Sequence, residues 1–132
     1  MGLYMLDTDI SSYLINENNK NAARNFQKHE KDTICISSVT YAEIKFGALN
    51  RKSQNLHIRI KNFMSLVKII DFGKAAADEY ALLRVFLNSR GTPVGNMDML
   101  IAATAKASGA VLVTNNEKHF SLVPDLVVEN WC

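Results

Sequence analysis

The chain has 132 residues, 48% of them hydrophobic and 21% charged, with a formal net charge of +2. This length suits one domain with a sizeable core, and the composition excludes a disordered chain. Two widely separated cysteines, Cys35 and Cys132, argue against a disulfide scaffold or a zinc knuckle. No apolar run approaches the roughly 20 residues that cross a bilayer. We therefore expect a single cytoplasmic domain over residues 1–132, with no membrane partner.

The first half of the sequence predicts strands that alternate with helices. Residues 2–6 form an apolar run and residues 33–36 a β-branched one, and both runs are typical of short buried strands. Helices are expected from residue 9 or 11 to 16, over 21–29, from 39 or 40 to about 50, and around the helically spaced Leu56, Ile60, Phe63 and Met64.

The second half continues the alternation. A strand is expected over 67–70, a helix over 74–89 with an apolar face of Ala81, Leu82, Val85 and Phe86, a helix over 99–107 that ends at Gly109, and an apolar strand over 110–113. The loop before the last helix, residues 91–95 with Pro93, is expected to be rigid and small. Alternating strands and helices predict an α/β doubly wound domain around a mainly parallel sheet.

Acidic residues stand at the ends or edges of three of these elements. Asp7 follows the first strand, Glu43 lies early in the helix after the second strand, and Asp98 comes just before the helix 99–107. Because strand ends and helix starts meet at one edge of a parallel sheet, we expect these carboxylates to lie together. Gathered carboxylates repel one another unless a cation neutralises them. The pattern predicts a divalent metal site of the kind that most often serves phosphate chemistry.

Helix capping offers a structural explanation at each position. Asp9, Ser11 or Ser12 could cap the first helix, which would leave Asp7 at the sheet edge without a partner.

The same argument applies to the other two acids. Thr40-x-x-Glu43 matches a capping box, in which the glutamate bonds back to the cap residue. Asn96 could cap the helix that follows Asp98. A carboxylate buried at that loop would still be costly unless a metal paired with it.

Polar residues also end the last strand, as Thr114-Asn115-Asn116. They could form an Asx turn, which is common at strand ends. In the functional interpretation, Asn116 is a neutral ligand or positions a water, and the Thr114 hydroxyl orients a carboxylate. The histidines, His29, His57 and His119, show no spacing typical of a ligand pair and are expected at the surface.

Basic residues concentrate in the middle of the chain. Between Ile44 and Lys74 the sequence holds Lys45, Arg51, Lys52, Arg59, Lys61, Lys68 and Lys74, against Asp71 alone. Such a band beside an acidic pocket would suit a polyanionic substrate. A solvated helix face explains the band equally well.

Four motifs in this order resemble those of PIN domains, and the chain most resembles the VapC toxins of VapBC toxin–antitoxin systems. The motifs are Leu6-Asp7-Thr8-Asp9, Ser37-Ser38-Val39-Thr40-x-x-Glu43, Asp98-x-x-Ile101-Ala102 and Thr114-Asn115-Asn116-x-x-x-Phe120. The resemblance covers essentially the whole length, including Pro93-Val94-Gly95 and Trp131. It implies a PIN-like three-layer α/β/α domain.

The resemblance also implies a function. That function is a Mg²⁺- or Mn²⁺-dependent endoribonuclease toxin, in which Asp7, Glu43 and Asp98 are catalytic and bind the metal. Asn116 is expected to be catalytic with them and falls where many relatives carry a further acid. Asp9 replaces a frequent asparagine. The implied substrate is RNA, most often the anticodon stem-loop of tRNA. The implied partners are a second copy of the chain and a VapB-type antitoxin, through which alone the toxin would meet DNA.

Two other functions remain open at this stage. Asp7-Thr8-Asp9-Ile10-Ser11 nearly reproduces the nucleophile motif of haloacid-dehalogenase-type phosphatases, with Asp7 as the nucleophile and Asp9 as the acid/base. The neutral Asn116 leaves room for a non-catalytic RNA-binding module with a degenerate site. Metal-dependent RNA cleavage would distinguish the nuclease from both.

Overall fold

Five parallel strands form the central sheet of the computed structural model, which describes residues 2–91 and 94–132. They are β1 (Leu3–Leu6), β2 (Thr33–Ser37), β3 (Lys68–Ile70), β4 (Val111–Val113) and β5 (Val128–Glu129). Their order across the sheet is β3-β2-β1-β4-β5, and every neighbouring pair is parallel. The α/β class and the parallel sheet are thus confirmed. The two-residue β5 was not expected, because its pairing with β4 depends on the fold and not on its own sequence.

Seven helices lie in the described part of the chain. They are α1 (Thr8–Asn16), α2 (Lys20–Lys28), α3 (Ser38–Asn50), α4 (Gln54–Met64), α5 (Lys74–Ser89), α6 (Asn96–Ser108) and α7 (Glu117–Phe120). The helix expected over 74–89 matches α5. The helix expected from residue 99 begins at Asn96, so Asp98 lies inside the first turn of α6 and not before it. The four-residue α7 was not expected.

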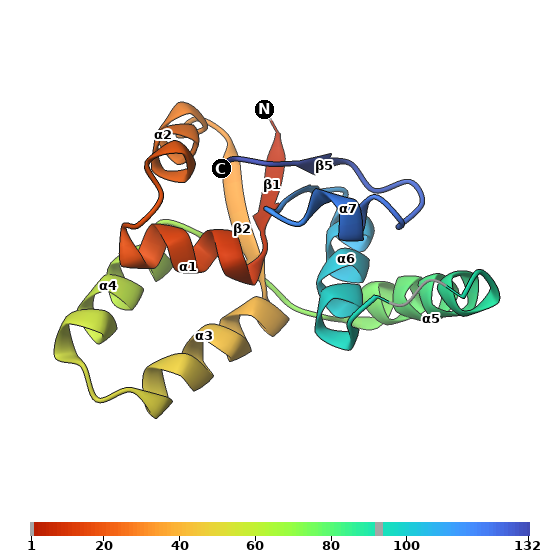
Figure 1. The fold of residues 1–132 in the computed structure, drawn as a ribbon, viewed down its shortest axis with the longest axis horizontal. Helices are drawn as coiled ribbons and strands as arrows, with labels where there is room; N and C mark the ends of the chain where they lie inside the picture. The colour runs from red at the N-terminus through yellow and green to blue at the C-terminus, as the bar shows by residue number, and fades with distance from the viewer. Residues whose placement is uncertain (1, 92–93) are drawn as a thin grey trace.

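Helices cover both faces of the sheet, as the three-layer prediction requires. Figure 1 shows α1 to α4 on one side and α5, α6 and α7 on the other. Neighbouring strand residues alternate between two cores: Met5 packs with residues of α5 and α6, and Leu6 packs with residues of α1, α3 and α4. In β4, Leu112 and Val113 divide in the same way. This alternation follows from the two-residue period of a strand.

The apolar face that the sequence indicated for α5 is the wrong one. Leu82 and Val85 are 68% and 70% exposed. The residues that α5 buries are Ala76, Leu83 and Leu87. The helix carries two apolar stripes, and only packing against α6 decides which one faces the core. The sequence pattern alone could not make that choice.

Trp131 anchors the C-terminal segment, since it is 2% exposed and stacks on the ring of His29. His29 is accordingly half-buried and not a free surface residue. No helix among residues 2–91 and 94–132 is long and apolar enough to cross a membrane. The loop expected over 91–95 includes Thr92 and Pro93, which lie outside the described residues.

Candidate active site

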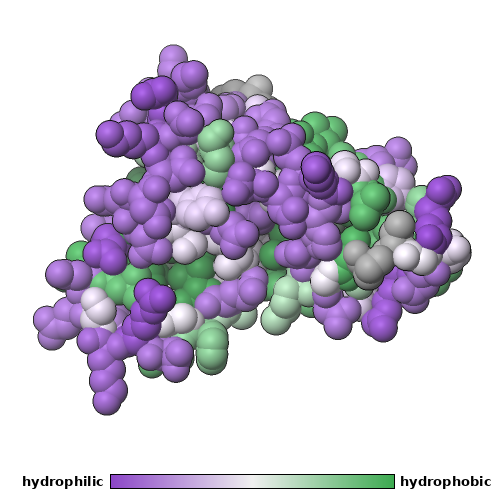
Figure 2. All heavy atoms as spheres, viewed as in Figure 1, coloured by the Kyte–Doolittle hydropathy of each residue, from purple (hydrophilic) through white to green (hydrophobic). Residues whose placement is uncertain are grey.

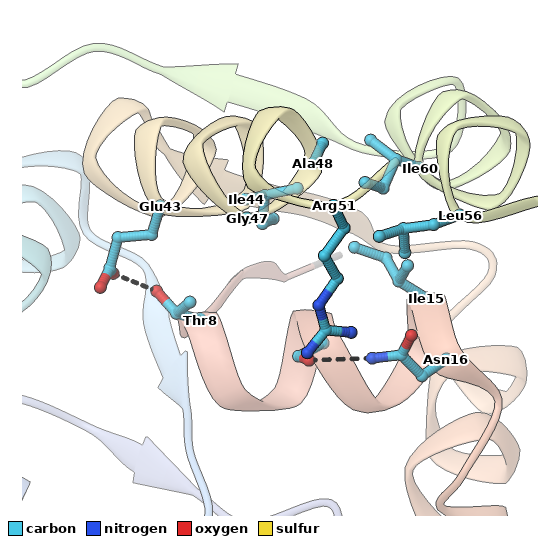
Figure 3. A pocket seen from close by; sticks show the side chains of 11 residues that line it. Thr8, Ile15, Asn16, Glu43, Ile44, Gly47, Ala48, Arg51, Leu56 and Ile60 are labelled. Atoms are coloured by element: carbon cyan, nitrogen blue, oxygen red, sulfur yellow. Dashed lines mark hydrogen bonds between the residues drawn. The ribbon is translucent and has the colours of Figure 1, made fainter. Parts of the chain in front are cut away.

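The acidic residues predicted from the sequence gather where β1 and β2 end and α1, α3 and α6 begin. Asp7 directly follows β1, and Thr114 directly follows the neighbouring strand β4. Glu43 lies on α3, which starts at the end of β2, and its carboxylate meets the first residue of α1 (Figure 3). Parallel topology accounts for this convergence, because the carboxyl ends of the strands share one edge of the sheet.

Asp7 is a buried carboxylate with a hydrogen-bond donor on each oxygen. Its Oδ1 accepts from the Ile10 N–H at 2.9 Å, and its Oδ2 accepts from the Thr114 hydroxyl at 2.5 Å. The first contact makes Asp7 itself the N-cap of α1. This excludes the alternative in which Asp9, Ser11 or Ser12 caps the helix, and the inference that Asp7 has no partner was wrong.

Burial sets the electrostatics of Asp7. Asp7 is only 5% exposed. This burial removes water from its carboxyl group and raises the pKa of that group to about 6. The Ile10 N–H and the Thr114 hydroxyl lower the pKa, and the charges of Asp9 and Asp98 raise it. The hydrogen bonds do not fully offset burial and like charge, so the protein by itself leaves this anion undercompensated.

Thr114 links the last strand to the acidic edge. It is fully buried, and its hydroxyl donates to Asp7 while accepting from the Asn116 N–H at 3.0 Å. The hydroxyl of Thr114 thus contacts a carboxylate, as expected. The Thr114 side chain thus builds this turn, in place of the Asx turn that was left open as an alternative. Asn116 is exposed, and its side chain makes no capping bond to α7.

Glu43 is held toward the same edge by a threonine. Its Oε1 accepts from the Thr8 hydroxyl at 2.5 Å, and that hydroxyl lies 3.2 Å from Thr40 Oγ1. The capping box that Thr40-x-x-Glu43 offered as an alternative does not form, because Ser37 caps α3 through the Thr40 N–H. Helix capping therefore does not explain Glu43, whose carboxylate is turned to α1.

Asp98 faces His119, a residue that was expected at the surface. Its Oδ2 lies 3.2 Å from His119 Nε2, on α7. Burial raises the pKa of Asp98, the His119 contact lowers it, and the charge of Asp9 raises it. The alternative of an Asn96 cap is excluded, since Gly95 is the cap residue of α6 and has no side chain to bond. Spacing gave no signal for the His119 contact, because the two residues lie on different helices.

The carboxylates at this edge are ligands that suit a hard divalent cation. In this structure, however, they contact hydrogen-bond donors of the protein. The charges of the exposed Asp9 and of Asp98 raise the pKa of Asp7, and the charge of Asp9 also raises the pKa of Asp98. Carboxylate oxygens are the ligands that Mg²⁺ and Mn²⁺ favour. Within residues 2–91 and 94–132, no three His, Cys, Asp or Glu side chains form a ready metal-binding group. Glu43 and Asp98 would thus have to turn from Thr8 and His119 to share an ion with Asp7.

Comparison with known proteins identifies the family. A model of the PIN domain matches residues 4–126. Ribonuclease VapC2 of Rickettsia felis is 40% identical over 131 residues, covering 98% of each chain. The tRNA(fMet)-specific endonuclease VapC of Shigella flexneri is 36% identical over 132 residues, covering 97% of each chain.

Solved structures agree. VapBC2 of Rickettsia felis, bound to a promoter DNA fragment, has a TM-score of 0.92 at 39% identity and covers 98% of this chain and 99% of that one. DNA-bound VapBC of Salmonella typhimurium has a TM-score of 0.87 at 32% identity, with full coverage of both chains. The chain therefore belongs to the PIN domain family. Within that family it is a VapC-type toxin.

Proposed function

We propose that this protein is a metal-dependent endoribonuclease, the toxin of a VapBC-type toxin–antitoxin system, which inhibits translation by hydrolysing RNA phosphodiester bonds. The observation that carries the proposal is the Asp7 carboxylate, at the edge of the sheet to which Glu43 also points. Burial first, and then the charges of Asp9 and Asp98, make this carboxyl harder to ionise. Such a cluster is most stable with a cation among its oxygens. PIN membership favours this function over the phosphatase alternative.

Asp7, Glu43 and Asp98 would hold a Mg²⁺ or Mn²⁺ ion. When bound, the ion supplies charge stabilisation to the phosphoryl oxygens and makes a water molecule more acidic. Thr114 and Thr8 keep two of the three carboxylates aimed at the edge through their hydroxyls. Asn116 would place a neutral polar group beside them, and Asp9 adds negative charge close to Asp7.

The proposed substrate is tRNA, cut in its anticodon stem-loop. Relatives from Shigella flexneri and Salmonella typhimurium are named tRNA(fMet)-specific endonucleases, at 36% and 32% identity to this chain. We extend that substrate to this protein. The exposed basic residues of α3 and α4 are available to contact the RNA backbone, since contacts to phosphates need no particular sequence.

The proposed partners are a VapB-type antitoxin and a second copy of the chain. Structural relatives were solved as VapBC complexes, two of them bound to DNA, so DNA would reach this chain through the antitoxin. Large apolar side chains are exposed on α3 and α5, namely Phe46, Leu49, Leu82 and Val85. Exposed apolar groups of this kind are typical of surfaces that bind other proteins.

Cleavage of total tRNA by the purified protein tests the function. We expect discrete fragments with 5′-phosphate and 3′-hydroxyl ends in Mg²⁺ or Mn²⁺, and none in EDTA or with Asp98→Asn. A 2′,3′-cyclic phosphate product would contradict the mechanism, because it requires the ribose hydroxyl as nucleophile. RNA binding by a folded wild-type protein that cuts neither tRNA nor ribosomal RNA would instead support the non-catalytic binding module.

A further inference from the structure

The backbone conformation of α3 does not require a glycine at position 47. Gly47 is helical and has no positive φ, unlike Gly91 and Gly109. Glycine destabilises a helix interior relative to alanine. A Cβ built on Gly47 would meet no atom of the protein within 4 Å. The missing side chain thus leaves open space at the surface of α3, and the fold itself makes no use of that space.

The space belongs to an open hollow lined by residues of α1, α3 and α4. Its volume is about 200 Å³, and Thr8 and Glu43 line it at the end nearest the acidic edge. The floor is apolar, with Ile15, Ile44 and Leu56 among the lining residues. Figure 3 shows these side chains pointing into the gap, and Figure 2 shows hydrophobic atoms between hydrophilic ones in the area that α1, α3 and α4 frame.

A positively charged side chain, that of Arg51, lies at the other end of the hollow. Arg51, the C-cap residue of α3, extends its side chain across the opening toward α1, where Asn16 donates to Ser12 at 3.2 Å (Figure 3). In the described residues, no carboxylate forms a salt bridge with Arg51. Two turns of α3 separate Glu43 from Arg51, so the hollow leads from the acids to a free positive charge.

We propose that this hollow binds one nucleotide of the RNA, next to the bond that is cut. Its base would rest on the apolar floor over Gly47, and a phosphate of the same strand would pair with Arg51. The proposal rests on the proposed function, since it places the scissile phosphate at the acidic edge. RNA loops suit such a site, because their unpaired bases can be turned outward and bound singly.

Size and charge favour a nucleotide. The hollow is smaller than the roughly 300–1,000 Å³ of pockets that hold a whole drug-sized ligand, so it matches one part of a larger molecule. A polyanion that approaches an acidic edge needs a cation close by, and Arg51 supplies it. The Asn16 amide can form hydrogen bonds with the edge of a base. A peptide side chain could fill the floor, and the experiment below distinguishes that occupant.

The test compares Gly47→Leu, which fills the hollow, with Ala77→Leu, which adds the same side chain to an exposed position of α5. The substrate is a stem-loop copied from the RNA that the wild-type protein cuts, in the intact form and with single loop nucleotides made abasic. We expect one abasic position to slow wild-type cleavage by at least about tenfold. Gly47→Leu should cut the intact RNA about as slowly as the wild-type protein cuts that abasic RNA. Removing the same base should not slow Gly47→Leu any further. Ala77→Leu should behave as wild type with both RNAs.

Arg51→Gln tests the phosphate contact, with Arg84→Gln on α5 as its control. In EDTA, where no cleavage occurs, Arg51→Gln should reduce the slope of log affinity against log salt by about one phosphate contact. Gly47→Ala should fold at least as stably as wild type, because its methyl group meets empty space. If Gly47→Leu does not fold, Gly47→Ala and the abasic series carry the test.

The outcomes separate this proposal from the proposed function. If the wild-type protein cuts no RNA, both are overturned. If it cuts RNA but Gly47→Leu cuts intact RNA equally fast, or no abasic position matters, only the nucleotide site is overturned. If Gly47→Leu cuts normally and escapes inhibition by the antitoxin, the hollow receives the protein partner, which also overturns it.

Discussion

The Thr114 hydroxyl and the Asp7 carboxylate form a 2.5 Å hydrogen bond that joins the ends of neighbouring parallel strands. Both residues are buried, and they are 107 positions apart in the chain. The contact lowers the pKa of Asp7 against the opposing effect of burial. Thr114 therefore helps to keep a buried acid charged and aimed at the site, which gives this residue a chemical role as well as a packing role.

Thr114→Val should impair the protein by removing that donor while keeping the side-chain shape. The pKa of Asp7 should rise above its present value of about 6, because burial and the neighbouring acids would act with less opposition. We expect the acid limb of the pH–activity profile to move to higher pH. Unfolding at neutral pH should become easier by roughly 1–3 kcal/mol, the cost of a buried polar group that loses its partner. Activity profiles and urea denaturation measure the two effects.

Thr114→Ser is the matched control, since it keeps the hydroxyl and removes one methyl group. It should retain the wild-type profile with a small loss of stability. If Thr114→Val and Thr114→Ser had the same pH profile, the hydroxyl would have no role in the charge of Asp7.

Asp7 should make the metal-free protein less stable as the pH rises. Its folded pKa of about 6 lies above its ordinary value of 3.8, so between these values the folded state holds a proton that the unfolded state has released. The Asp7 contribution to the free energy of unfolding should therefore fall from about pH 4 to about pH 6 and then level off. Asp7→Asn removes this fall and should be more stable than wild type at pH 7 by about 1–3 kcal/mol.

Denaturation in EDTA across pH 4–8 checks this, with Asp71→Asn as the control at an exposed position away from Asp7. Asp7→Asn should also be inactive, because it removes a proposed metal ligand. A variant that is both more stable and inactive would separate the functional role of Asp7 from its role as a helix cap, which asparagine also fills. A variant less stable than wild type at pH 7 would refute the direction of the shift.

Added Mg²⁺ or Mn²⁺ should stabilise the wild-type protein. A ligand that binds only the folded state raises the free energy of unfolding. Once the ligand concentration exceeds the dissociation constant, the increase grows with the logarithm of their ratio. The increase in melting temperature should shrink strongly in Asp7→Asn and Asp98→Asn. It should also shrink below about pH 6, where protons compete for Asp7. An equal rise in wild type and in both variants would show that the cation binds elsewhere.

Much of the architecture could be predicted from local patterns. The bounds of α5 and the positions of β1 to β4 follow from hydrophobic periodicity and from glycine stops, which act over a few residues. The convergence of Asp7, Glu43 and Asp98 followed from the general rule that parallel strands end at one edge.

The errors concern choices that depend on distant parts of the chain. The N-cap of α1 is Asp7 and the cap of α3 is Ser37, whereas local motifs favoured residues further along. The exposed stripe of α5 looks as apolar as its buried one, and only α6 distinguishes them. The contact of His119 with Asp98 joins two helices whose relative placement no spacing encodes.

Glu43 and Thr8 allow charge and orientation to be separated at the site. Glu43→Gln keeps an oxygen that can accept from the Thr8 hydroxyl but removes the negative charge. Thr8→Val keeps the charge but removes the donor that aims it.

If Glu43 binds the metal, Glu43→Gln should reduce cleavage by roughly a hundredfold or more, in line with the several kcal/mol that a metal ion contributes. Thr8→Val should cost less, and extra Mn²⁺ should partly restore it, because the carboxylate is still present. Cleavage rates across a Mn²⁺ titration measure both, with thermal unfolding as the check on folding. Equal losses that added Mn²⁺ does not relieve in either variant would assign Glu43 a structural role at the junction of α1 and α3.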